Sequence, residues 1–63
     1  MPIINVDMLE GRDDATRERL IAEITDAAVR ALGAPRETVR VILHEVPKQN
    51  FGIGGTSAKA LGR

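Results

Sequence analysis

The chain has 63 residues, no cysteine and a single histidine, so neither disulfides nor a histidine-cysteine metal cluster can stabilise it. Because a chain of this length buries only about 60% of the surface that its unfolded form exposes, we expect self-association to complete its core. Its nine basic and nine acidic residues cancel, which disfavours nucleic acid or an anionic membrane as a partner, and no apolar run approaches the roughly 20 residues that span a bilayer, so we expect a cytoplasmic protein.

The first predicted element is a β-strand over residues 2–9. This segment is rich in β-branched residues and alternates, with Ile4, Val6 and Met8 on one face and polar side chains on the other. The alternation breaks around Gly11, so the strand ends before this glycine.

An amphipathic helix is predicted next. Asp13 or Asp14 can cap its first turn, and Gly33 suits the left-handed position that ends a helix. Charged residues occupy one side, including Asp26 and Arg30, which we expect to pair across one turn in solvent. The apolar positions of the other side recur at helical spacing, and they are Leu20, Ile21, Ile24, Ala27, Ala28, Ala31 and Leu32.

A second strand is predicted over residues 39–46, with Val41 and Leu43 on one face and Arg40 and Ile42 on the other. A strand, a helix and a strand joined by short connections predict a right-handed crossover between parallel strands. The expected fold class is therefore α/β (α+β), a single β-α-β subunit over residues 1–63. Two strands alone leave two unpaired edges, so we expect further copies to pair with them.

The C-terminal stretch NFGIGGTSAK, residues 50–59, holds the only aromatic residue, Phe51, among three glycines. It is not a phosphate-binding P-loop, in which lysine directly follows the second glycine, because Lys59 comes four residues after Gly55. The glycines instead predict a sharp turn, and this segment could link further copies of the chain.

Two features are candidates for chemistry, Pro2 and the arginines Arg12 and Arg40. Pro2 would carry a secondary amine once Met1 is removed, and a free α-amino group titrates at about 7.7 to 8.0, although a proline here can also simply start a strand. Arg40 interrupts an apolar run, where a permanent charge needs a partner or a pocket, although a solvated or interface-paired arginine fits as well. His44 has no serine and carboxylate arrangement around it and cannot form a zinc site alone.

Five short motifs stand along the chain: Pro2-Ile3, Leu9-Glu10-Gly11-Arg12, Ala34-Pro35, Val39-Arg40-Val41-Ile42 and Phe51-Gly52-Ile53-Gly54-Gly55. In order and spacing they resemble the 4-oxalocrotonate tautomerase family, and the similarity spans the whole chain. The resemblance implies a β-α-β subunit with a C-terminal hairpin, the tautomerase fold, assembled as a homo-hexamer that is a trimer of dimers.

The resemblance also implies an activity, a cofactor-independent keto-enol tautomerase that converts dienols such as 2-hydroxymuconate to 2-oxo-3-enedioates. Pro2 would be the general base. Arg12 would bind the distant carboxylate, and Arg40 of a neighbouring subunit would contact the 2-oxo group and the carboxylate beside it. Phe51 would supply an apolar wall, Leu9 would contact the substrate, and no metal is implied.

Two alternatives stay open at this point. Relatives that hydrate haloacrylates place a glutamate where this chain has Ile53, which disfavours hydration chemistry here. A subunit that is non-catalytic, or active only with a partner in a hetero-hexamer, would keep the same scaffold, and retention of Met1 would leave the Pro2 nitrogen as a non-basic amide. His44 and Asn50 lie outside the matching pattern.

Overall fold

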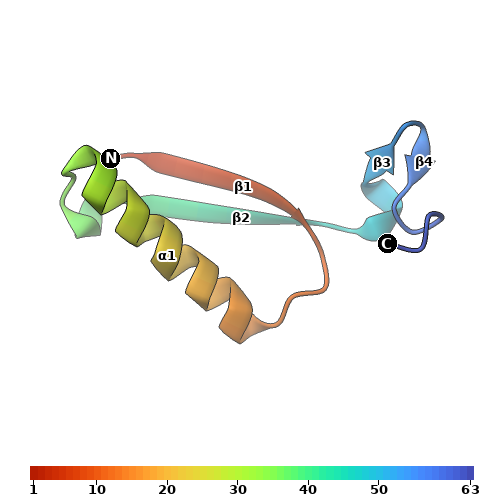
Figure 1. Ribbon diagram of the computed structural model, residues 1–63, viewed down its shortest axis with the longest axis horizontal. Helices are drawn as coiled ribbons and strands as arrows, with labels where there is room; N and C mark the ends of the chain where they lie inside the picture. Colours follow the sequence, from red (N-terminus) through yellow and green to blue (C-terminus); the bar gives the residue numbers. More distant parts are fainter.

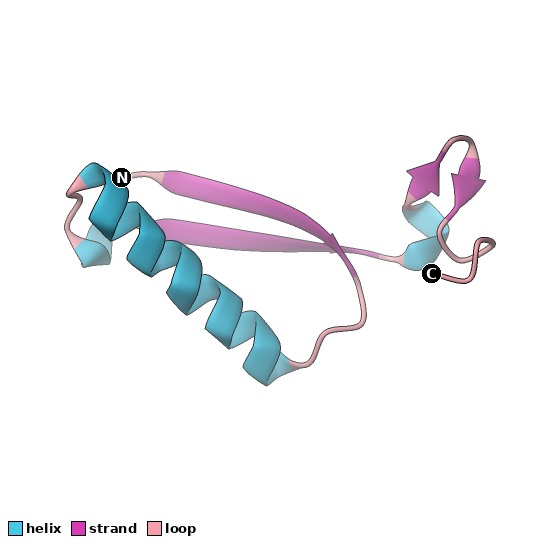
Figure 2. Cartoon of the chain, viewed as in Figure 1, coloured by secondary structure: helices cyan, strands magenta, loops and turns pink.

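A computed structural model describes all residues, 1–63, and its elements follow the predicted order (Figures 1 and 2). The predicted bounds of both long strands and of the helix are confirmed to within one residue. Short 3₁₀ turns precede and follow the second strand, at Arg36–Thr38 and Lys48–Asn50. The strands and the helix are β1 (Ile3–Leu9), α1 (Asp14–Leu32), β2 (Arg40–Val46), β3 (Gly52–Ile53) and β4 (Thr56–Ser57).

The two long strands form a parallel pair, as predicted. Their register runs from Ile3 opposite Arg40 to Leu9 opposite Val46. Along both strands exposed and half-buried residues alternate, because successive side chains of a strand point to opposite faces. Helix α1 lies along this pair and leaves the other face of the sheet uncovered (Figure 1).

Local signals at both ends explain where α1 begins and ends. Of the two predicted capping residues, Asp13 is the cap, and its side chain accepts a hydrogen bond of 2.9 Å from the backbone N–H of Thr16. At the other end Gly33 has φ of 66°, and its N–H donates to the carbonyl oxygen of Val29. This left-handed closure ends the helix at the predicted residue.

One chain covers only part of the predicted apolar side of α1. Ala27, Ala31 and Leu32 are exposed, whereas Thr25 and Val29 lie on the half-buried side. Packing against the sheet decides which side is covered within one chain, and periodicity alone does not determine that packing. Thr25 is tolerated there because its hydroxyl donates to the carbonyl oxygen of Ile21 at 2.7 Å.

The predicted pair of Asp26 with Arg30 is wrong. Asp26 instead pairs with Arg36, which lies in the 3₁₀ turn before β2. The chain reverses at Gly33, so a residue ten positions away reaches the helix surface as readily as one a single turn away.

The subunit has almost no core of its own. Only Ala28 and Ala58 are buried, while Ile3 and Ile42 on the uncovered face of the sheet are 53% and 44% exposed. A small domain that leaves this much apolar surface in water is marginal, and burial against other copies is the physical remedy.

The C-terminal residues form the predicted hairpin, which lies beyond the ends of β1 and β2 (Figure 1). Gly54 and Gly55 join β3 to β4 and have φ of 59° and 89°, a conformation that favours glycine at both positions of a two-residue turn. The N–H groups of Ala58 and Lys59 donate to the carbonyl oxygens of Phe51 and Lys48, which ties the base of the hairpin to the second 3₁₀ turn.

Candidate active site

Two of the predicted site residues meet where the strands begin. The backbone N–H of Arg40 donates to the carbonyl oxygen of Pro2 at 3.0 Å, which continues the ladder between β1 and β2. The Arg40 side chain turns back along its own segment, where Nη1 donates to the carbonyl oxygen of Glu37 at 2.6 Å. Pro2 and Arg40 therefore adjoin through their backbones within one chain, while the guanidinium is held beside the preceding 3₁₀ turn.

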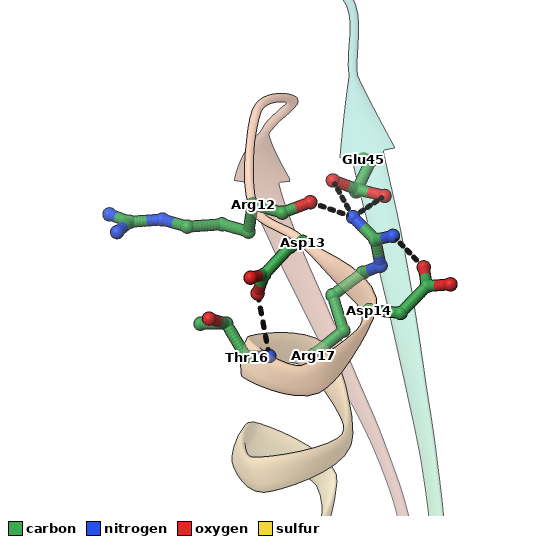
Figure 3. A network of polar contacts seen from close by, with 6 residues as sticks. All are labelled: Arg12, Asp13, Asp14, Thr16, Arg17 and Glu45. Atoms are coloured by element: carbon green, nitrogen blue, oxygen red, sulfur yellow. Dashed lines mark hydrogen bonds and ion pairs between the residues drawn. The ribbon is translucent and has the colours of Figure 1, made fainter.

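Leu9 and Arg12 lie at the opposite end of the sheet. They share an open hollow of about 340 Å³ with Lys48 and with Arg63 of the C-terminal segment. The Arg12 side chain makes no hydrogen bond or ion pair in the structure, and it extends away from the neighbouring charged residues (Figure 3). The hollow is lined by three basic residues, one of them the unpaired Arg12, and by one acidic residue, Glu10, and this excess of positive charge suits an anionic ligand.

Phe51 lies at this second end as well. It follows the 3₁₀ turn after β2, is half-buried, and accepts a backbone hydrogen bond of 2.7 Å from Ala58 at the base of the hairpin. The ring does not line the hollow beside Arg12. Ile53 is 37% exposed on β3.

A single chain therefore does not assemble the predicted site. Pro2 precedes β1 and Leu9 ends it, and seven strand residues at about 3.3 Å each separate the two ends by roughly 20 Å. Of the predicted residues, the structure brings Pro2 close to Arg40, and Leu9 close to Arg12. Contact of Pro2 with Arg12 or Phe51 requires a second copy of the chain.

The loop between β1 and α1 lies among charged side chains (Figure 3). The hydrogen bonds from Thr16 hold the pKa of Asp13 below its ordinary value. The hydrogen bond from Arg17 to the carboxylate of Asp14, together with the nearby charge of Glu45, raises the pKa of Arg17 above its ordinary value. Both groups are charged throughout the neutral range, so the loop sits in a fixed electrostatic environment.

Sequence reasoning missed Glu10, Lys48 and Arg63 as neighbours of Arg12. Glu10 lies in the motif Leu9-Glu10-Gly11-Arg12, so its proximity to Arg12 could have been predicted from the sequence. Lys48 and Arg63 are brought to the hollow only by the turn after β2 and by the hairpin, and no local pattern marks them.

The two residues outside the family pattern lie away from the hollow. His44 faces Asp7 across the exposed side of the sheet, with Nδ1 3.8 Å from the carboxylate. Asn50 is exposed at the end of the second 3₁₀ turn. No group of three or more His, Cys, Asp or Glu side chains gathers to hold a metal ion. No helix has the length and apolar character needed to cross a membrane.

Comparison with known proteins identifies the family. The family described as "Tautomerase enzyme" matches residues 2–61. The chain belongs to the tautomerase family. A 2-hydroxymuconate tautomerase from Stutzerimonas stutzeri is 56% identical to it over 63 residues, which is the full length of both proteins.

Solved tautomerase structures have the same fold. One chain from a study of 4-oxalocrotonate tautomerase isozymes of Methylibium petroleiphilum superposes with a TM-score of 0.94 at 50% identity, and the match covers 98% of this chain and 100% of that one. A chain described as a fused 4-OT wild-type asymmetric trimer superposes with a TM-score of 0.95 at 40% identity, covering 100% of this chain and 51% of that one. The predicted β-α-β tautomerase fold is confirmed.

Proposed function

We propose that the protein is a cofactor-independent tautomerase that converts 2-hydroxymuconate-like dienols to 2-oxo-3-enedioates. The observation that carries this proposal is the similarity, over the full length of both chains, to a protein named 2-hydroxymuconate tautomerase. The hollow at Arg12 adds support, because a dicarboxylate substrate needs a cationic site for its second carboxylate.

The proposed base is the amine of Pro2. In the structure Met1 precedes it, so the nitrogen is an amide, and the base exists only once Met1 has been removed. A free α-amino group has a pKa of about 7.7 to 8.0, and guanidinium groups nearby favour its neutral form. The neutral amine takes the proton of the substrate hydroxyl and returns one to the carbon beside the distant carboxylate, so the net change is a proton shift.

The two arginines divide the charge of the substrate. Arg12 binds the distant carboxylate and draws electron density toward the carbon that is protonated, while Arg40 contacts the 2-oxo oxygen and the adjacent carboxylate. Leu9 contacts the substrate beside Arg12, and the Phe51 ring supplies an apolar wall that lowers the local polarity around the amine.

We propose that the site is shared between chains of a homo-hexamer, a trimer of dimers. The separation of Pro2 from Leu9 along β1 supports this. Two copies that lie side by side in antiparallel orientation place the start of one sheet beside the end of the other. The exposed Ile3 and Ile42 give such an assembly an apolar face to bury. A hetero-hexamer would satisfy the same geometry, and native mass spectrometry of the purified chain tests whether one sequence suffices.

The activity is tested by following 2-hydroxymuconate in the ultraviolet across pH, with Met1-free protein. The expected profile has kcat/KM low in acid and rising to a plateau as one amine loses its proton. Absence of turnover at every pH would reject the proposed function and leave a non-catalytic subunit as the better account.

A further inference from the structure

The loop that carries Arg12 is anchored at both ends. At its start the N–H of Glu10 donates to the carbonyl oxygen of Val46, and the Glu10 carboxylate accepts from the N–H of Lys48, each at 3.0 Å. At its end Asp13 caps α1. Arg12 lies between these anchors with its side chain unpaired, so its position depends on what holds its own backbone.

The residue that holds the Arg12 backbone is Arg17. One nitrogen of its guanidinium donates to the Arg12 carbonyl oxygen and lies 3.1 Å from the carboxylate oxygens of Glu45 on β2, while the other donates to Asp14 (Figure 3). The Arg17 side chain is only 26% exposed. One planar group thus joins the loop, the first turn of α1 and the end of β2, and the rigid fork of an arginine holds several donors at a fixed spacing for this.

Apolar packing is thin at this end of the helix. The first turns of α1 stand off from β2 and leave an open hollow of about 370 Å³, with Ile21 and Leu43 as its apolar lining. Across that hollow the Arg17–Glu45 contact is the one ion pair between α1 and β2. Because apolar packing is thin here, the contacts of Arg17 add a polar anchor at the Arg12 backbone, between the anchors at Glu10 and Asp13.

We propose that Arg17 and Glu45 are positioning residues, which hold the Arg12 backbone so that its unpaired guanidinium meets the distant carboxylate of the substrate. The inference rests on the proposed role of Arg12 in the tautomerase reaction. Neither Arg17 nor Glu45 lines the hollow beside Arg12, so in this proposal both act through Arg12.

This mechanism predicts a change in selectivity. The test compares kcat/KM for 2-hydroxymuconate with kcat/KM for the matching 2-hydroxydienoate that has a single carboxylate and nothing for Arg12 to bind. A misplacement of about 1 Å can lower the rate on the order of 100-fold. We therefore expect the looser positioning of Arg12 in Arg17→Met to lower the ratio of kcat/KM for 2-hydroxymuconate to kcat/KM for the monocarboxylate by about tenfold. Glu45→Gln and Arg17→Lys, which keep part of the contact, should give smaller losses in the same direction.

Arg36→Gln is the matched control, since it removes the pair that Arg36 forms with Asp26 on the opposite end of α1. Its ratio should equal that of the wild type. The double variant Arg12→Gln with Arg17→Met should show no loss of the ratio beyond Arg12→Gln alone, because both changes act on one interaction.

The outcomes separate the inference from the proposed function. If Arg12→Gln leaves the ratio unchanged, the proposed role of Arg12 is wrong. If Arg12→Gln lowers the ratio but the Arg17 and Glu45 variants do not, or if they slow both substrates equally, the positioning inference is overturned while the function stands. Should Arg17→Met fail to fold, Arg17→Lys and Glu45→Gln decide the question by the same ratio.

Discussion

Removal of the Arg12 guanidinium should weaken turnover of a dicarboxylate without weakening the fold. The Arg12 side chain has no hydrogen bond or ion pair within its chain, so Arg12→Gln leaves no partner group unsatisfied and should not lower the melting temperature. In the site, the change replaces a charged hydrogen bond to a carboxylate with a neutral one.

The magnitude follows from the strength of that contact. Hydrogen bonds to charged groups contribute about 1.5 to 3 kcal/mol, and at about 1.4 kcal/mol for each factor of ten this range corresponds to a loss of roughly 10- to 150-fold in kcat/KM. The substitution should lower kcat as well as raise KM, because negative charge builds toward the distant carboxylate in the transition state.

The assay is the ultraviolet measurement of 2-hydroxymuconate, with the monocarboxylate dienol as an internal control and thermal unfolding as a check on folding. For the monocarboxylate control substrate, kcat/KM of Arg12→Gln should be close to that of the wild type. An unchanged rate with 2-hydroxymuconate, or equal losses on both substrates, would refute the assignment of Arg12 to the distant carboxylate.

Three further predictions concern other residues. Arg40→Ala should lower turnover on the order of 100-fold, since removing a donor to developing charge costs about 2.7 to 4 kcal/mol, with the oligomer intact by size-exclusion chromatography; a near wild-type rate contradicts the role. Phe51→Ala should impair kcat/KM far more than thermal stability, because the ring lies outside the subunit core, and a loss confined to stability would place it in packing instead. Asp13 has a folded-state pKa lowered below its ordinary 3.8 by the hydrogen bonds from Thr16, so its contribution to stability is present above the unfolded value and is lost as pH falls through the folded one. Asp13→Asn keeps a capping oxygen but does not titrate, so the drop in melting temperature between neutral and acid pH should be smaller than in the wild type, and an equal drop would exclude Asp13 as a source of acid sensitivity.

The elements that sequence predicted well are those set by local chemistry. The cap at Asp13, the left-handed Gly33 and the alternation of the strands act within a few residues, so the bounds of β1, α1 and β2 could be read from the chain. The two-residue turn at Gly54 and Gly55 belongs to the same class, because its backbone angles favour glycine at both positions.

The features that sequence did not predict depend on contacts between distant segments. Leu32 is exposed within the chain. Packing of the helix against the sheet, and not the local sequence, determines which of its apolar residues are covered. Arg36 reaches Asp26, and Arg17 reaches Glu45, only after the chain has folded back. Neither of these two ion pairs has a sequence spacing from which it could be predicted.

The candidate site was predicted as a set of residues shared between neighbouring subunits. Family resemblance picked out Pro2, Leu9, Arg12, Arg40 and Phe51, and the parallel pairing of β1 with β2 then separates Pro2 from Leu9 by the length of a strand. The roles of these residues stay a prediction, while the fold shows that one chain does not bring them together.

The most direct test of the account is the chemistry of the Pro2 nitrogen. Protein with Met1 removed and protein that retains Met1, each verified by intact mass and shown to form the same oligomer, are compared with 2-hydroxymuconate across pH. The account predicts turnover only for the Met1-free form, with kcat/KM that rises as a single amine loses its proton. Equal turnover by the form that retains Met1 would contradict it, because that nitrogen is an amide and cannot act as the base.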